Sequence, residues 1–361
     1  MGTNKPAKER NRKIIDAIIK KAQQVCPGSL ALIGVYGSVH TGDVHTKSDL
    51  DLLILINDEA GYKLASGFIL DDTEIGYDLY CTTWESLEED AAFTHPHLGK
   101  LMDSEIVYCA DDAYLERLQA LRKSVSEKLA APFTFADFRN AYQALKEAEH
   151  YYFLAMTSEE LSEVRKYAGA ALYYIEDSLA LLNRQYFRMS VRKIYEELSG
   201  FAFTPTNIDS LIENVVSAAS VSVLQDQLTQ LIKKTRSTFD SKYETISFAR
   251  KEPEKDSLIG TYEEMVSNWR GKMYLAAKTN NCHLAFMSLV NFDSMLSDIR
   301  QENGIPELDV MAVYDPRDLE KTARDFDRLL DEYLKEYKKT GITVKRYPDL
   351  NAFIKDYLKE E

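Results

Sequence analysis

The chain has 361 residues, of which 45% are hydrophobic and 28% charged, as in ordinary folded globular proteins and unlike disordered or collagen-like chains. Its formal net charge of -14 repels polynucleotide phosphates, and its Lys and Arg residues form no basic stripe, so we expect no long nucleic acid as partner. No stretch approaches the ~20 apolar residues of a membrane span, and the charged N-terminus lacks a signal-peptide pattern. We therefore expect a cytoplasmic protein without membrane contact.

The first third of the chain predicts an α/β unit. Apolar residues recur at helical spacing over 9–25, and Pro27-Gly28 ends this pattern. Short apolar runs predict strands on either side of a polar loop, then a hairpin around Asp71-Asp72-Thr73-Glu74 and a last strand before a helix. The expected strands are 30–36, 50–56, 67–70, 75–82 and 104–109, and the expected helix is 111–129. The spacing of Thr82 and Glu85 is that of a capping box, which begins a helix.

After residue 131 the pattern is almost wholly helical. Helices are expected at about 135–157, 159–187, 208–218, 222–247, 257–279, 282–302 and 316–339. A charged, proline-broken stretch, Lys251 to Asp256, divides this part of the chain. We therefore expect an α+β protein with a mixed-sheet N-terminal domain (1–131), a helical bundle (132–250) and a second helical subdomain (251–361).

The chemically informative stretch begins where the first strand ends, at Gly37-Ser38. A small residue pair at a strand end lets backbone N–H groups and a hydroxyl approach phosphate groups. Ten residues follow, of which Ser48 is the last, and then come Asp49-Leu50-Asp51. Residues two apart on a strand share a face, so the two carboxylates are placed to hold Mg²⁺ against a triphosphate. Their mutual repulsion is most directly offset by a bound divalent cation.

Asp78 is the third carboxylate candidate. It lies in an apolar strand pattern, where aspartate is uncommon, and its side chain could complete a second metal site or act as a base. Asp71, Asp72 and Glu74 are nearby acidic residues that we assign to the hairpin turn instead.

Gly-Ser, ten residues, Asp-x-Asp and a later strand aspartate together resemble the signature of the polymerase-beta nucleotidyltransferase superfamily. The resemblance covers about residues 9–125, and the sequence is most similar to bacterial kanamycin and lincosamide nucleotidyltransferases with a helical C-terminal domain. It implies nucleotide binding by Gly37, Ser38 and Ser48, and two Mg²⁺ ions held by Asp49, Asp51 and Asp78 as catalytic residues. It also implies an NTP substrate, a small acceptor molecule and, by analogy with these drug-modifying enzymes, a homodimer.

The predicted activity is transfer of an NMP, with AMP preferred, to a hydroxyl of a small cationic acceptor by in-line attack at the α-phosphate. Two alternatives stay open: a protein-AMPylating enzyme like nucleotidyltransferase antitoxins, and a non-catalytic nucleotide sensor or scaffold. The acceptor, the preferred base and the identity of the general base are not fixed by the sequence.

Weaker candidates each have a structural interpretation that we favour. Glu147 or Glu149 could serve as the general base that similar enzymes take from their helical domain, but a solvated helix face explains both. Loop solvation explains His40 and His45. His95 and His97 lack zinc-ligand spacing and are expected at the surface. The run from Asn268 to Lys272, which contains Trp269 and Arg270, could contact phosphate or substrate, but we do not favour this role. The four cysteines, Cys26, Cys81, Cys109 and Cys282, also lack such spacing and are expected to be reduced.

Overall fold

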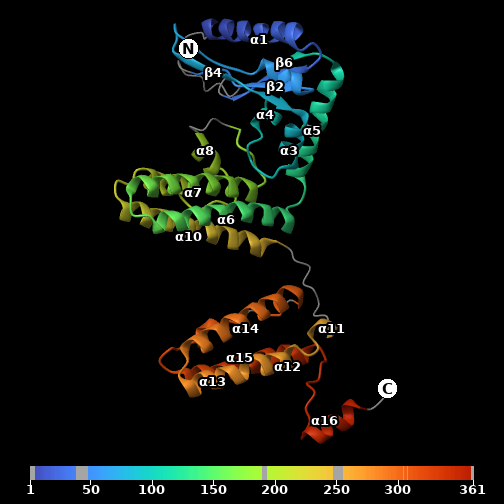
Figure 1. Ribbon diagram of the computed structural model, residues 1–361, viewed down its shortest axis with the longest axis vertical. Coiled ribbons are helices and arrows are strands. Elements are labelled where there is room, and N and C mark those ends of the chain that lie inside the picture. Colours follow the sequence, from blue (N-terminus) through green and yellow to red (C-terminus); the bar gives the residue numbers. More distant parts are fainter. Residues whose placement is uncertain are drawn as a thin grey trace. The chain divides into compact units, whose positions relative to one another are not determined.

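The computed structural model describes residues 5–37, 48–188, 193–246, 255–303, 305–306 and 308–358. The chain forms two compact units, Met1–Ile246 and Ser247–Glu361, and each is described by itself (Figure 1). The α+β class is confirmed, because a mixed sheet near the N-terminus is followed by a helical remainder. The division predicted at residue 131 stays a prediction. A single hydrophobic core extends across it, from Leu53 in the sheet to Phe239 in the helical part.

A four-stranded mixed sheet has the order β5-β2-β1-β6. The central pair, β1 (Leu30–Val35) and β2 (Leu52–Ile56), is antiparallel and fully buried, as expected for short apolar runs. On the outer side of β1 lies the antiparallel β6 (Glu105–Cys109), and on the outer side of β2 the parallel β5 (Cys81–Thr83). The sheet therefore holds the end of β1 next to the start of β2.

The two faces of the sheet pack against different elements. Ile54 and Ile56 face a core formed with α1 (Lys5–Val25) and the hairpin strands, whereas Leu53 and Leu55 face the larger core shared with the helices. Figure 1 shows α1 on one side of the sheet and α3, α4 and α5 on the other. Because successive strand residues point to opposite faces, this division also sets which way the polar residues beside the strands point.

The predicted hairpin forms, but as a separate two-stranded sheet of β3 (Ser66–Leu70) and β4 (Ile75–Leu79). The expected single strand 75–82 is divided, because β4 pairs with β3 whereas β5 pairs with β2. Residues 71–74 form the turn, as predicted.

Helix α3 (Trp84–Ala92) begins one residue later than the Thr82–Glu85 spacing predicts. The hydroxyl of Thr83 accepts a hydrogen bond from the backbone N–H of Ser86, because buried Thr82 belongs to the β5 ladder. The other helices of the first unit are α4 (Gly99–Met102), α5 (Asp112–Ala130), α6 (Phe135–Thr157), α7 (Leu161–Leu182), α8 (Ile194–Ser199), α9 (Ile208–Val216) and α10 (Val221–Thr245).

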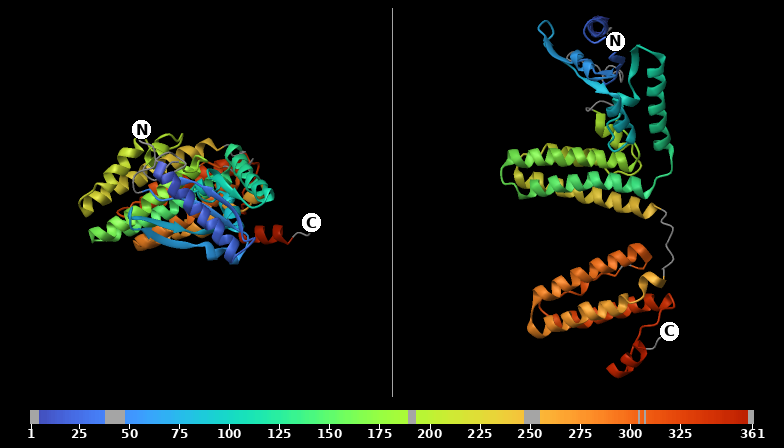
Figure 2. Two further views of the ribbon diagram at one scale, coloured as in Figure 1. Left: turned by 90° about the horizontal axis from the view of Figure 1, so that it is seen from above. Right: turned by 45° about the vertical axis from the view of Figure 1, so that its right-hand side comes forward.

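Helices α6, α7 and α10 pack together, and α8 lies between this layer and the sheet, as both views show (Figures 1 and 2). The helical layer is joined to the sheet part through residues 95–103. Within that stretch, the carbonyl of Pro96 accepts a hydrogen bond from the backbone of Phe187, and Asp103 accepts one from the hydroxyl of Tyr186. These two hydrogen bonds hold the segment after α7 against residues 95–103.

The second unit is helical and has its own core, centred on Phe292, Phe326 and Tyr333. Its expected first helix, 257–279, is divided because Gly260 has a positive φ of 88° that ends the first turn. The elements are α11 (Lys255–Leu258), α12 (Thr261–Met265), the π-helical turn η3 (Val266–Arg270), α13 (Gly271–Thr279), α14 (Cys282–Asn303), η4 (Met311–Val313), α15 (Leu319–Lys339) and α16 (Leu350–Tyr357). Among the described helices of both units, none is long and apolar enough to cross a membrane.

Candidate active site

The end of β1 brings Gly37 against the carboxylate of Asp51. The β1–β2 ladder continues one residue beyond Val35, because the backbone N–H of Tyr36 donates to the carbonyl of Asp51 at 3.1 Å. Gly37 then turns the chain with a φ of 66°. A Cβ atom at Gly37 would lie 2.0 Å from Oδ2 of Asp51, so only glycine fits here. The predicted glycine and the predicted second aspartate are therefore direct neighbours.

Asp49 and Asp51 flank the buried Leu50 just before β2 begins. Both lower the local electrostatic potential near the Tyr36 hydroxyl. Burial, the hydrogen bond with Tyr80, and the negative charges of the two aspartates together raise the pKa of Tyr36. Because a like charge disfavours ionisation of a neighbour, the contribution of the two aspartates shows that both lie near this hydroxyl, although burial is the largest cause of the raised pKa.

Asp49 also affects the pKa of Tyr77, a buried residue of the hairpin strand β4. Burial raises the pKa of Tyr77; Arg10 opposes this shift and Asp49 reinforces it. The guanidinium of Arg10, from α1, lies 5.7 Å from the centre of the Tyr77 ring. An arginine from the first helix is thus close to the carboxylate region, which the sequence patterns did not indicate.

Asp78 is exposed on β4, on the opposite side of the strand from buried Tyr77 and Leu79. The alternation continues into exposed Tyr80, so Asp78 and Tyr80 share a face. In the β2–β5 ladder, Ile54 pairs with Cys81, an offset of 81 − 54 = 27 residues. If this parallel register continued toward the start of both strands, Asp78 (51 + 27 = 78) would lie level with Asp51. The ladder itself ends before that point, where β4 turns away to pair with β3.

Of the other predicted binding residues, Ser48 is buried, with 6% of its surface exposed, directly before Asp49. Ser38, His40 and His45 lie outside the described residues. Within the described ranges, no three His, Cys, Asp or Glu side chains are grouped so that they could hold a metal ion. The oxygen donors of Asp49 and Asp51 are nevertheless of the type that Mg²⁺ prefers, at a point of high negative charge. The donor chemistry fits a hard divalent cation.

A second group of ionisable side chains lies where residues 95–97 meet α7. Nε2 of His97 is 2.8 Å from Oδ1 of Asp177, and the hydroxyl of Tyr173 lies 3.0 Å from the same ring nitrogen. His95 similarly lies 3.3 Å from Asp90. Both histidines keep about 40% of their side-chain surface exposed, at 41% and 39%, so each is a surface residue with a carboxylate partner.

Glu176 adjoins this group and was not singled out by the sequence patterns. Burial, and then the charge of neighbouring Asp177, raises its pKa to about 7. Its own charge in turn helps to raise the pKa of Tyr195 in α8. Tyr195 belongs to α8, so Glu176 is a titratable group of α7 close to α8. Nothing in the local sequence marks it, because burial, the largest cause of its raised pKa, depends on the fold.

The weaker candidates make structural contacts. Glu149 pairs with Arg236 at 3.2 Å, and Glu147 accepts a hydrogen bond from Gln143, in keeping with a solvated helix face. In the second unit, Arg270 forms two hydrogen bonds to Asp327. All four cysteines are free.

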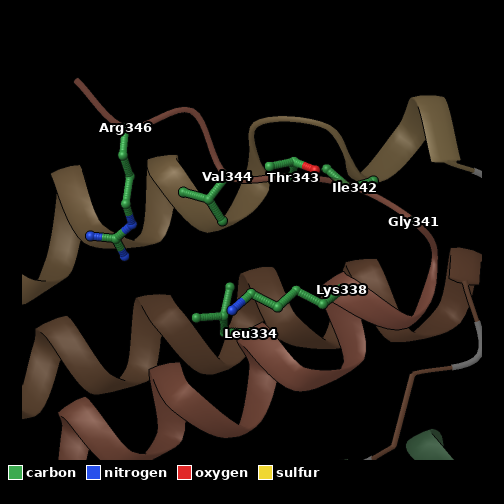
Figure 3. Close-up of a pocket in the computed structure, with 7 residues that line it drawn as sticks. All are labelled: Leu334, Lys338, Gly341, Ile342, Thr343, Val344 and Arg346. Atoms are coloured by element: carbon green, nitrogen blue, oxygen red, sulfur yellow. The ribbon is translucent and has the colours of Figure 1, made fainter.

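The second unit contains a cavity of about 410 Å³ between the end of α15 and the segment that follows it (Figure 3). Its polar lining comes from Lys338, Thr343 and Arg346, and Figure 3 shows the Arg346 side chain directed toward α15. No carboxylate lines this cavity, so it lacks the ligands that metal-dependent phosphoryl transfer needs.

Comparison with known proteins agrees with the sheet region as the site. Residues 12–103 match the family model of the nucleotidyltransferase domain, and this range contains Gly37, Asp49, Asp51 and Asp78. The match supports nucleotidyl transfer in general. No curated protein matches the chain.

Among solved structures, the chain is similar to a nucleotidyltransferase-like protein from Exiguobacterium sibiricum 255-15. The two sequences are 11% identical, and the match covers 62% of this chain and 73% of that one, with a TM-score of 0.27. At that score the similarity bears on neither the arrangement of the domains nor the acceptor.

Proposed function

We propose that this protein is a Mg²⁺-dependent nucleotidyltransferase that transfers an NMP, preferentially AMP, from an NTP to a hydroxyl of a small cationic acceptor. The contact of Gly37 with Asp51 is the observation that carries the proposal. A carboxylate packed directly on a glycine turn lets a triphosphate approach the backbone and the carboxylate at the same point. The nucleotidyltransferase-domain match over the same residues supports this interpretation.

In this proposal Asp49 and Asp51 hold the Mg²⁺ ions, with Asp78 as the third carboxylate. When bound, two such ions neutralise phosphate charge and lower the pKa of the attacking hydroxyl, which favours in-line attack at the α-phosphate. The protein's own part is to orient the triphosphate at the Gly37 turn, with Asp49 and Asp51 just before the start of β2 and Asp78 supplied from the separate β3–β4 hairpin. Their ionised forms are the ones that the chemistry requires.

The acceptor class follows from charge. A net charge of -14 favours a cationic molecule over an anionic one, and Glu176 and Asp177 add two adjacent carboxylates on α7. The specific similarity to kanamycin and lincosamide nucleotidyltransferases suggested by the motif belongs to this proposal.

The test is pyrophosphate release by the purified full chain with Mg²⁺, each of the four NTPs and a panel of acceptors that includes aminoglycosides and lincosamides. We expect acceptor-dependent release that is fastest with ATP, and a product heavier than the acceptor by one AMP. Absence of release with every NTP and acceptor, in a protein that is folded by circular dichroism, would contradict the proposed function.

A further inference from the structure

Two tyrosine hydroxyls meet beside the candidate carboxylates. The hydroxyls of Tyr36 and Tyr80, 44 residues apart in the chain, are hydrogen-bonded to each other. Tyr36 lies at the end of β1, with its backbone N–H bonded to the carbonyl of Asp51. Tyr80 lies between β4 and β5, on the same face as Asp78. The pair therefore connects the strand end that bears Asp51 to the strand face that bears Asp78.

Proton counting shows that the pair has one donor to spare. Each hydroxyl has one proton and can both donate and accept. The mutual bond uses one of the two protons, whichever hydroxyl donates it. The other proton must be directed at a third group, and the ring of Tyr80, with 42% of its surface exposed, gives that group access from solvent.

Both hydroxyls of the pair are hydrogen-bond donors. A tyrosine hydroxyl is neutral at physiological pH and carries one proton that it can donate. Among the four side chains at this strand end, the two aspartates can only accept hydrogen bonds when ionised, so the tyrosines supply the donor.

We propose that the Tyr80 hydroxyl, held in place by Tyr36, donates a hydrogen bond to a phosphate oxygen of the bound nucleotide. Tyr80 is then a substrate-binding residue, and Tyr36 is a positioning residue that acts through it. This inference rests on the proposed function, because it requires the triphosphate to lie between the Gly37 turn and the face of Asp78. A hydrogen bond to a charged oxygen is stronger than one between neutral groups, so its loss should be measurable.

The experiment compares Tyr80→Phe, Tyr36→Phe and the double variant, which remove only hydroxyl groups. NTP titrations of pyrophosphate release give kcat and KM, and calorimetry gives the affinity for the NTP with Mg²⁺. Tyr62→Phe is the matched control, because Tyr62 is 51% exposed in η1 (Glu59–Leu64), after the other end of β2. The Tyr80→Ala variant also removes the ring, so its comparison with Tyr80→Phe distinguishes the contribution of the ring from that of the hydroxyl.

We expect each single variant to weaken NTP binding by about tenfold to a hundredfold, and the double variant to be no weaker than either single one. Such non-additivity is the mark of two residues acting as one unit. Tyr62→Phe should bind as the wild type does, and Tyr80→Ala should lose little more affinity than Tyr80→Phe.

Two results would overturn the inference while leaving the proposed function intact, provided that the wild type is active. The first is unchanged NTP binding in Tyr80→Phe, and the second is additive losses of NTP affinity in the double variant. If Tyr80→Phe is unaffected and only Tyr80→Ala is impaired, the ring binds the nucleotide and the hydroxyl does not. If the wild type itself neither binds an NTP nor releases pyrophosphate, the proposed function fails and this inference fails with it.

Discussion

The sheet region of the first unit and the helical second unit use carboxylates in opposite ways. In the second unit Asp327 accepts hydrogen bonds from Arg270 and Tyr274, and although burial opposes it, these contacts lower its pKa. In the sheet region, burial and the bond with Tyr80 raise the pKa of Tyr36, and the charges of Asp51 and Asp49 add to that rise. A carboxylate paired with a neighbouring cation stabilises a fold, whereas carboxylates that raise the pKa of their neighbours mark a site where a cation or substrate is to bind.

The sharpest test of this contrast is Asp51→Asn, which removes a charge but keeps the shape of the side chain. We expect NMP transfer to fall by a hundredfold or more, roughly, because a charged ligand at the reacting phosphates is lost. Folding should be little changed, and relief of the repulsion between Asp49 and Asp51 should add slightly to stability. Steady-state pyrophosphate release and thermal unfolding measure the two effects.

Asp58→Asn is the matched control for that variant. Asp58 lies just after the other end of β2, where its side chain caps η1 by accepting from the backbone N–H of Ala60. Asparagine caps as well as aspartate, so activity and stability should both stay close to wild type. Equal losses in the two variants would mean that Asp51 has no special part in the reaction.

Gly37→Ala should have the next largest effect. The added methyl group would collide with the Asp51 carboxylate, and the positive φ at this position disfavours any side chain. We expect about a tenfold to a hundredfold loss of activity, because small displacements of catalytic groups are costly, and a stability loss of roughly 1–3 kcal/mol. Pyrophosphate release and chemical denaturation are the measurements.

The Gly28→Ala variant distinguishes the backbone strain of a positive φ from the collision with Asp51 that Gly37→Ala also causes. Gly28 has a positive φ of 85°, but a Cβ atom there would meet nothing within 4 Å. This variant should lose about 1 kcal/mol of stability and keep wild-type kcat/KM. If it loses as much activity as Gly37→Ala, the contact with Asp51 is not what makes Gly37 necessary.

The Glu176→Gln variant tests a carboxylate that, like Asp49 and Asp51, has a second carboxylate nearby. Glu176 belongs to the helical layer and not to the sheet region. Burial and Asp177 raise the pKa of Glu176 to about 7, so the folded state holds this proton more tightly than the unfolded state. The resulting stabilisation is complete below the ordinary pKa of 4.5 and is lost as the pH rises through about 7. Glutamine resembles the protonated form and should therefore stabilise the protein above pH 7, by up to about 3 kcal/mol.

Thermal unfolding at pH 5 and pH 8.5 measures the difference between Glu176→Gln and wild type. The gain should be large at the higher pH and small at the lower one. Glu159→Gln, at an exposed position just before α7, should give no such difference. A gain that is the same at both pH values would show that charge at Glu176 does not set the stability.

The smallest effect is expected in the second unit. Arg270→Ala removes a largely exposed ion pair with Asp327, in which the two side chains are 49% and 28% exposed. Such pairs contribute up to about 1 kcal/mol. We expect a shift of that size in the denaturation of the full chain and unchanged pyrophosphate release. A clear loss of activity would show that the second unit takes part in the reaction and would remove the contrast between the two regions.

The sequence by itself determined most helices and strands, because apolar periodicity and turn residues act over a few positions. It also predicted that Gly37 and Asp51 flank two strands joined by a polar loop, and these strands pair as neighbours. The role of the two residues stays a prediction. It failed where a helix depended on a single glycine, as at Gly260, and where a strand had two possible partners, as at residues 75–83.

Tertiary structure alone decided the rest. The bond between Tyr36 and Tyr80 joins residues 44 positions apart, and the raised pKa of Glu176 comes first from burial. Desolvation and through-space charge depend on which surfaces meet after folding, and no local pattern of residues encodes them. The candidate carboxylates could therefore be selected from the sequence, whereas the neighbouring groups that contact them and shift pKa values could not.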